Sequence, residues 1–96
     1  MLQYIIFAWD GTDDKSLERR MNARPVHFEC ARQLKSNNNF ILGGAMLDDA
    51  GKMIGSTMVV QFETEEGLKE WLEKEPYIEG SVWEKFEVRP FRVADV

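Results

Sequence analysis

The chain is poor in the residues that build metal and redox centres. Its 96 residues include one cysteine, Cys30, and one histidine, His27. A single cysteine excludes an intramolecular disulfide and fits a reducing cytoplasm, which is the location we expect. One cysteine and one histidine are too few soft ligands for an ordinary zinc site, and no loop has the ligand spacing of a calcium site. We therefore expect no bound metal.

The chain also lacks an excess of positive charge and a long apolar run. It carries 12 basic and 17 acidic residues, a net charge of −5. Surfaces that bind nucleic acid or anionic membranes are basic, so we expect neither partner. The apolar run at residues 2–9 is too short to span a bilayer, and no basic segment precedes it as in a signal peptide. With 44% apolar and 30% charged residues, the composition is typical of a globular protein, and the length predicts one domain over residues 1–96.

The first half of the chain predicts a strand, a helix and a second strand. Residues 2–9 are β-branched and aromatic, which is typical of a strand, and a polar loop follows at residues 10–16. From residue 16 to about residue 34, apolar side chains recur at helical spacing. Pro25 has no amide donor and its ring crowds the carbonyl four residues earlier, so we expect the helix to break near Arg24 and restart at Pro25. The asparagines at 37–39 are typical of a helix end.

The second half predicts a hairpin, a helix and a final strand. Residues 40–47 and 53–63 are the two strands, joined by turn residues. Residues 64–75 form a helix, with Thr64 as its N-cap. Residues 76–81 form a short turn or a single helical turn, and residues 82–91 form the last strand. The order βαββαβ predicts a ferredoxin-like α+β sandwich with a four-stranded antiparallel sheet.

Both faces of this sheet carry apolar side chains. In the first strand, Tyr4 and Ile6 point to one face, and Ile5 and Phe7 point to the other. The helices of such a fold cover only one face. Burying the second face would contribute roughly 25 cal/mol per Å² of apolar surface. We therefore expect a homodimer in which the second face packs against another copy of the chain.

The lone histidine is the strongest candidate for chemistry. An imidazole ordinarily titrates at about pH 6.5, which suits proton transfer near neutrality. On a helix, His27 follows Arg24 by one turn, so the cation could attract an anionic substrate. The orienting carboxylate is either Asp10, at the end of the first strand, or Glu75, directly before Pro76. The pattern does not choose between these acids, and it equally permits a packed histidine with two solvated acids.

Other polar residues have weaker patterns. Gly43 and Gly44 open no helix, so they predict a close approach or a bulge beside a cavity rather than a phosphate loop. Ser56 has no nucleophile motif but could line a pocket as a hydroxyl donor. We expect Cys30 to be a buried, unreactive thiol and Asp13 to be a solvated loop residue.

Three segments together resemble a known family. These are the opening that contains "ARPVHFE", the hairpin "ILGGAM" with "GSTMVVQFET", and the ending "EPYIEGSVWEKFEVRPF". The R-P-x-H run, the glycine- and serine-containing hairpin, the D-P-Y-like corner and the V-x-P-F strand occur in the order of the YCII-related (YciI-like) family. The resemblance covers essentially the whole chain. It implies a dimeric α+β barrel of ferredoxin-like fold with a histidine–aspartate active site.

The resemblance also implies roles for individual residues. The family histidine falls on His27, and the corner acid falls on Glu75, which is one methylene longer than the usual aspartate. Asp10 matches a commonly acidic position after the first strand. Weaker matches near the implied cleft are Arg24, Ser56 and Tyr77, and Gly44 would line the same cavity.

The function that we expect follows from these residues and the resemblance. Some members of the family look like lyases or dehydrochlorinases that act on small hydroxylated aromatics, and the fold is shared with isomerases. We expect a cofactor-free enzyme that uses His27 and a carboxylate to move a proton on a small anionic or phenolic metabolite. The alternative is a non-catalytic homodimer that binds a small-molecule ligand or regulates a partner.

Overall fold

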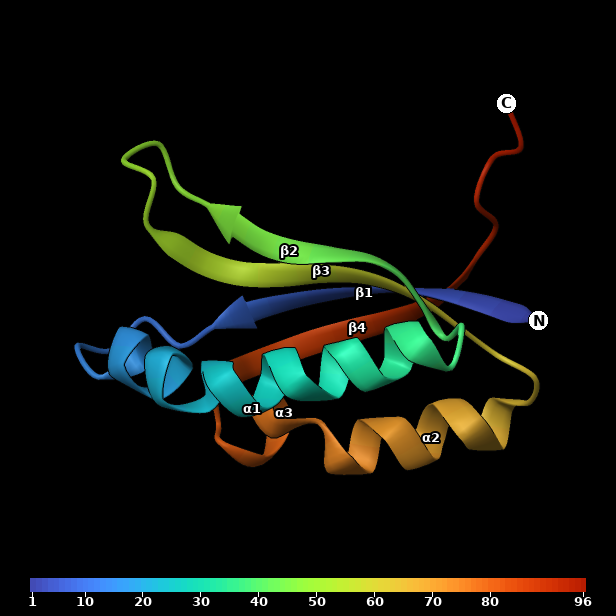
Figure 1. The fold of residues 1–96 in the computed structure, drawn as a ribbon. Coiled ribbons are helices and arrows are strands. Elements are labelled where there is room, and N and C mark those ends of the chain that lie inside the picture. Colours follow the sequence, from blue (N-terminus) through green and yellow to red (C-terminus); the bar gives the residue numbers. More distant parts are fainter.

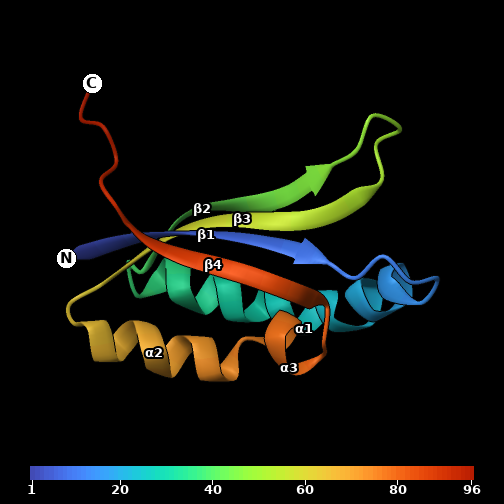
Figure 2. The same ribbon diagram turned by 180° about the vertical axis from the view of Figure 1, so that it is seen from behind.

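The computed structural model describes residues 1–96 as a sheet with helices on one side. In chain order the elements are β1 (Leu2–Asp10), α1 (Ser16–Ser36), β2 (Phe40–Leu47), β3 (Met53–Phe62), α2 (Glu65–Lys74), α3 (Pro76–Glu79) and β4 (Trp83–Phe91). The strand order is β2-β3-β1-β4, and every neighbouring pair is antiparallel. Figures 1 and 2 show all three helices below the same face. The predicted ferredoxin-like α+β fold is confirmed.

The core lies between the helices and the two central strands. Alternate residues of a strand point to opposite faces, and those of β1 and β3 that face the helices are buried. The cluster comprises Tyr4, Ile6, Ala8, Leu34, Met58, Val60, Phe62, Leu68, Trp71, Tyr77, Val82 and Trp83. Only one of these, Leu34, comes from α1. Among the helices, α2 and α3 therefore supply most of the apolar packing, and the buried face of α1 contributes little to it.

Most predicted helix boundaries are confirmed. Thr64 caps α2 by accepting a hydrogen bond from the backbone N–H of Gly67 at 3.2 Å. Asn38, after the end of α1, has a positive φ of 63°, as expected of asparagine at a helix end. The segment after α2 contains a single helical turn, α3. None of the helices has an apolar stretch long enough to cross a bilayer.

The predicted break at Pro25 is wrong. One helix runs through it from Ser16 to Ser36. A proline inside a helix removes one hydrogen bond and costs about 3 kcal/mol. Two side chains that α1 buries, Arg20 and His27, lie on either side of Pro25. Both reach partners on other elements from this one helix, and these contacts offset the local penalty.

Small residues on β2 leave space beside α1. Gly43 pairs with Met58, and Ala45 pairs with Ser56, so both lie at positions that face the helices. A Cβ on Gly43 would lie 3.0 Å from the Phe40 ring, so even an alanine would crowd this space. The predicted cavity beside the glycine pair is confirmed. The pairing register of β2 with β3 shifts between Phe40 and Leu42.

We predict that Gly55→Ala destabilises the fold. A Cβ at Gly55 would collide with the carbonyl oxygen of Ala8 and lie 2.6 Å from the terminal carbon of Met46. Overpacking of this kind costs about 1–3 kcal/mol, measured as the free energy of unfolding in urea. Gly44→Ala is the matched control, because a Cβ there would meet nothing within 4 Å. Equal unfolding free energies for the two variants would contradict the prediction.

Candidate functional site

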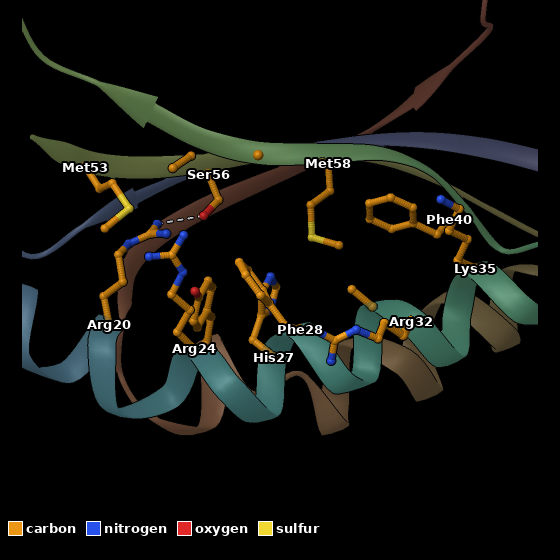
Figure 3. Close-up of a pocket in the computed structure, with 15 residues that line it drawn as sticks. Arg20, Arg24, His27, Phe28, Arg32, Lys35, Phe40, Met53, Ser56 and Met58 are labelled. Atoms are coloured by element: carbon orange, nitrogen blue, oxygen red, sulfur yellow. Dashed lines mark hydrogen bonds between the residues drawn. The ribbon is translucent and has the colours of Figure 1, made fainter. Parts of the chain in front are cut away.

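A cleft of about 330 Å³ separates α1 from the β2–β3 hairpin. The wall on α1 includes Arg24, His27 and Phe28, and the wall on the sheet includes Ser56 and Met58. Figure 3 shows the side chains of α1 and β3 extending toward one another across this space. Gly44 and Tyr77 also line it. The cleft therefore brings together His27 and all four predicted substrate-binding residues.

The side chains that α1 buries are mainly polar. They are Ser16, Arg20, His27 and Leu34. An amphipathic helix usually buries an apolar stripe, because a buried charge is costly unless it is paired. Arg20 is 2% exposed and His27 is 7% exposed, so each needs a partner within the protein.

The partner of His27 is Glu75. The ring Nδ1 is hydrogen-bonded to Glu75 Oε1, and Glu75 is almost completely buried. Glu75 lies between α2 and α3, where Oε1 also accepts a hydrogen bond from the backbone N–H of Tyr77 at 3.2 Å. This second bond fixes the carboxylate. A carboxylate at Nδ1 favours the tautomer that carries its proton there, so Nε2 is the ring nitrogen left to accept a proton.

Tyr77 packs directly on the histidine. The two rings are stacked, with centroids 3.7 Å apart and an interplanar angle of 8°. The guanidinium of Arg20 lies 4.9 Å from the centroid of the Tyr77 ring. The Tyr77 hydroxyl is buried and has no hydrogen-bond partner in the protein. Burial raises the pKa of this hydroxyl above its usual value, although Arg20 and Arg24 oppose the shift. It therefore stays protonated near neutral pH and is available as a donor.

Asp10 lies against Arg20 and not against His27. Arg20 Nε donates to Asp10 Oδ2 at 2.7 Å, and Nη2 donates to Oδ1 at 3.0 Å. Nη2 is also 2.8 Å from the carbonyl oxygen of Gly55 and 2.7 Å from Ser56 Oγ. Of the two acids that the sequence left open, the structure therefore places Glu75 beside the histidine. Asp10 instead anchors α1 to the end of β1.

Arg20 is the site residue that sequence reasoning missed. It precedes Arg24 by four residues and His27 by seven, so all three lie on one helical face. That spacing is the feature of the sequence from which Arg20 could have been identified. Its partner, Asp10, was already a candidate from its place at the end of a strand.

Two other polar residues, Cys30 and Asp13, lie outside the cleft. The pKa of the Cys30 thiol is raised, first by burial and then by nearby carboxylates such as Glu75, so the thiol stays protonated. Asp13 is not merely solvated, because Arg19 binds both of its oxygens at 2.6 and 2.9 Å. This hydrogen bonding is the main reason that the pKa of the Asp13 carboxyl lies well below its usual range. No three His, Cys, Asp or Glu side chains gather as a metal site would need.

The chain matches known proteins over nearly its whole length. The family model of the YCII-related domain matches residues 3–92. Protein YciI of Escherichia coli O6:H1 is 33% identical over 95 residues, which cover 93% of this chain and 95% of that protein. An uncharacterised protein of Haemophilus influenzae is 32% identical over 97 residues, covering 95% and 97% of the two chains.

Solved structures agree with the fold. A 5-chloro-2-hydroxyhydroquinone dehydrochlorinase from Burkholderia phenoliruptrix, in complex with 2,5-dihydroxybenzoquinone, superposes with a TM-score of 0.80 at 20% identity. The match covers 96% of this chain and 95% of that one. A dimeric ferredoxin-like protein from Jannaschia sp. CCS1 has a TM-score of 0.58 at 9% identity, covering 97% and 100%. At these identities the likeness shows the fold alone.

We predict that Asp10→Asn destabilises the protein by about 3–5 kcal/mol, because it leaves the buried Arg20 guanidinium without its countercharge. Asp13→Asn is the matched control, since it makes the same change in an ion pair at the surface. Urea denaturation of both variants gives the comparison. The prediction fails if Asp10→Asn unfolds at the same urea concentration as the control.

Proposed function

This chain belongs to the YCII-related family, and from that premise we propose that it is an enzyme of lyase or isomerase type. Its reaction moves a proton on a small anionic or phenolic metabolite. One observation carries the proposal: a buried histidine has one ring nitrogen held by a buried carboxylate and lies in the wall of a cleft. A buried histidine with only a structural role would also need a polar partner, but it would not need to line a cleft.

His27 serves as the general base and Glu75 as the residue that positions it. Nε2 takes a proton from a carbon atom of the bound substrate. The electron pair of that C–H bond forms a double bond, either expelling a leaving group from the next carbon, as in a lyase, or shifting an existing double bond, as in an isomerase. The imidazolium is stabilised by the Glu75 carboxylate and returns the proton to the leaving group or to another carbon.

Three donors near His27 fit a negatively charged or phenolic oxygen. Arg24 lines the cleft and has no carboxylate partner, and its guanidinium lies 4.9 Å from the Phe28 ring centroid. Tyr77 supplies an unpartnered hydroxyl. Ser56 Oγ accepts hydrogen bonds from Arg20 and Trp83, so its own proton is free to be donated. The dehydrochlorinase from Burkholderia, whose ligand is a hydroxylated quinone, supports this choice of substrate.

The partner that we propose is a second copy of the chain. The sheet face opposite the helices carries Ile5, Phe7 and Trp9 on β1, with Leu42 and Val59 beside them. Trp9 is 40% exposed and Leu42 is 53% exposed, and no helix covers them (Figure 1). An apolar face of this kind marks an interaction surface. The ferredoxin-like protein from Jannaschia is dimeric, which supports a dimer here.

We predict catalysed exchange of carbon-bound hydrogen for deuterium. The protein is incubated in D₂O with a panel of hydroxybenzoates, hydroxyquinols and unsaturated carboxylates, and proton NMR follows loss of their C–H signals. His27→Asn should lower the exchange rate by roughly 10²–10⁴-fold, the usual contribution of a general base. Glu75→Gln should lower it less, because the base remains but loses its orienting charge.

Cys30→Ser is the control, because Cys30 lies one turn from His27 outside the cleft. It should exchange at the wild-type rate. Exchange that is equally fast in wild type and His27→Asn would overturn the proposal. A panel compound that shifts the His27 ring signals without any exchange would favour the alternative, a non-catalytic dimer that binds a metabolite.

We predict that Leu42→Lys produces a monomer at micromolar concentration, because it places a charge in the apolar face that we expect the second copy to cover. Sedimentation velocity measures the mass. Val26→Lys is the control, since Val26 is 58% exposed on α1, away from that face. A wild-type monomer, or an unchanged dimer in Leu42→Lys, would contradict the prediction.

A further inference from the structure

The cleft has a charge opposite to that of the whole protein. The chain carries 12 basic and 17 acidic residues. Four of the basic residues line the cleft, namely Arg20, Arg24, Arg32 and Lys35, and none of the acidic residues does. A concave site lined by one sign of charge concentrates ligands of the other sign. The charge of this cleft therefore favours an anionic ligand, although the protein as a whole is acidic.

The ion pairs indicate how many charges the ligand brings. Arg20 is neutralised by Asp10, and Arg32 Nη1 lies 3.1 Å from Glu29 Oε2. Arg24 forms no ion pair; its Nη1 lies 4.0 Å from the Met21 sulfur, and its guanidinium lies over the Phe28 ring. Lys35 forms no ion pair within the chain. Two cations of the cleft are thus left without a countercharge.

These two cations lie at opposite ends of the cleft. An α-helix rises about 1.5 Å per residue, so positions 24 and 35 of α1 are roughly 16 Å apart along the axis. Figure 3 shows Arg24 near one end of the drawn pocket and Lys35 near the other, with Met58 between them. The wall between them includes the apolar residues Phe28, Ala31 and Met58, together with His27 and Arg32. Glu75 and Glu29 partner these last two side chains, so the middle of the cleft has apolar surface and no unpaired cation.

We propose that the ligand of this cleft is an elongated dianion, with one anionic group at each end of an apolar body. One group binds Arg24, with the hydroxyls of Ser56 and Tyr77 as further donors. The other binds Lys35 beside Phe40. The inference concerns the same cleft as the proposed function and deepens it. It requires that the cleft binds a ligand, but not that His27 is catalytic.

Linear carboxylic acids test this with defined probes. Isothermal titration calorimetry at low ionic strength, where surface charges are least screened, compares dicarboxylates from succinate to sebacate with monocarboxylates of equal carbon number. Suberate and sebacate should bind at least about tenfold more tightly than octanoate and decanoate. Succinate should gain no such advantage over butyrate, because it is too short to reach both cations. Equal affinities of the long diacids and monoacids would overturn the inference.

Substitutions of single cations test whether the second anionic group of the ligand binds Lys35. Lys35→Gln should weaken suberate binding roughly five- to tenfold and leave octanoate within about twofold, whereas Arg24→Gln should weaken both acids. Lys74→Gln is the matched control, because it removes the same charge from an exposed position at the end of α2. If Lys35→Gln and Lys74→Gln weaken suberate equally, Lys35 makes no direct contact and the inference is wrong.

A further variant separates this inference from the proposed function. His27→Asn should keep the preference for diacids while losing hydrogen–deuterium exchange. If wild type prefers diacids but catalyses no exchange, the dianion inference stands and the enzyme proposal falls. If wild type catalyses exchange but binds the long diacids no more tightly than the monoacids, the enzyme proposal stands and the dianion inference falls.

Discussion

The structure depends on the pairing of two ionisable side chains that α1 buries against the rest of the protein. Arg20 and His27 lie on the covered side of that helix, where most helices place apolar residues. Burial removes water from both groups, so each must be met by a charged or polar partner at hydrogen-bonding distance. Asp10 meets Arg20 from the end of β1, and Glu75 meets His27 from the junction of α2 and α3. The two pairs therefore determine where α1 lies.

The two pairs differ in whether the side chain on α1 keeps a polar atom without a partner. Arg20 donates to the Asp10 carboxylate, to the carbonyl of Gly55 and to the hydroxyl of Ser56. This guanidinium is bound on several sides, and its role is to hold β1, β3 and α1 together. His27 uses one ring nitrogen and keeps the other. The same device, a buried side chain paired with a carboxylate, thus serves as scaffold at one position and leaves a ring nitrogen free to accept a proton at the other.

The parts of the fold that follow from local chemistry were predictable from the sequence. Strand alternation, the Thr64 cap and the asparagine after α1 each depend on a few neighbouring residues. The helix break predicted at Pro25 does not occur, because contacts from Arg20 and His27 to distant elements override the local penalty of the proline. The family resemblance pointed to His27, but no local rule could choose between Asp10 and Glu75. That choice depends on how α2 and α3 pack beneath α1, since Glu75 is 48 residues from the histidine.

Glu75 stands where the family resemblance implies an aspartate, and the structure shows how the longer side chain is accommodated. A longer side chain has more rotamers to lose on ordering, and that entropy opposes a fixed carboxylate. Here Oε1 is held at two points, by the His27 ring and by the backbone N–H of Tyr77. The second contact is the N-terminal cap of α3, so the bond that begins this helix also places the carboxylate. Because Tyr77 stacks on His27 as well, one short turn supplies the acid, its support and a wall of the imidazole. Glu75 therefore bridges the backbone of that turn and the imidazole ring.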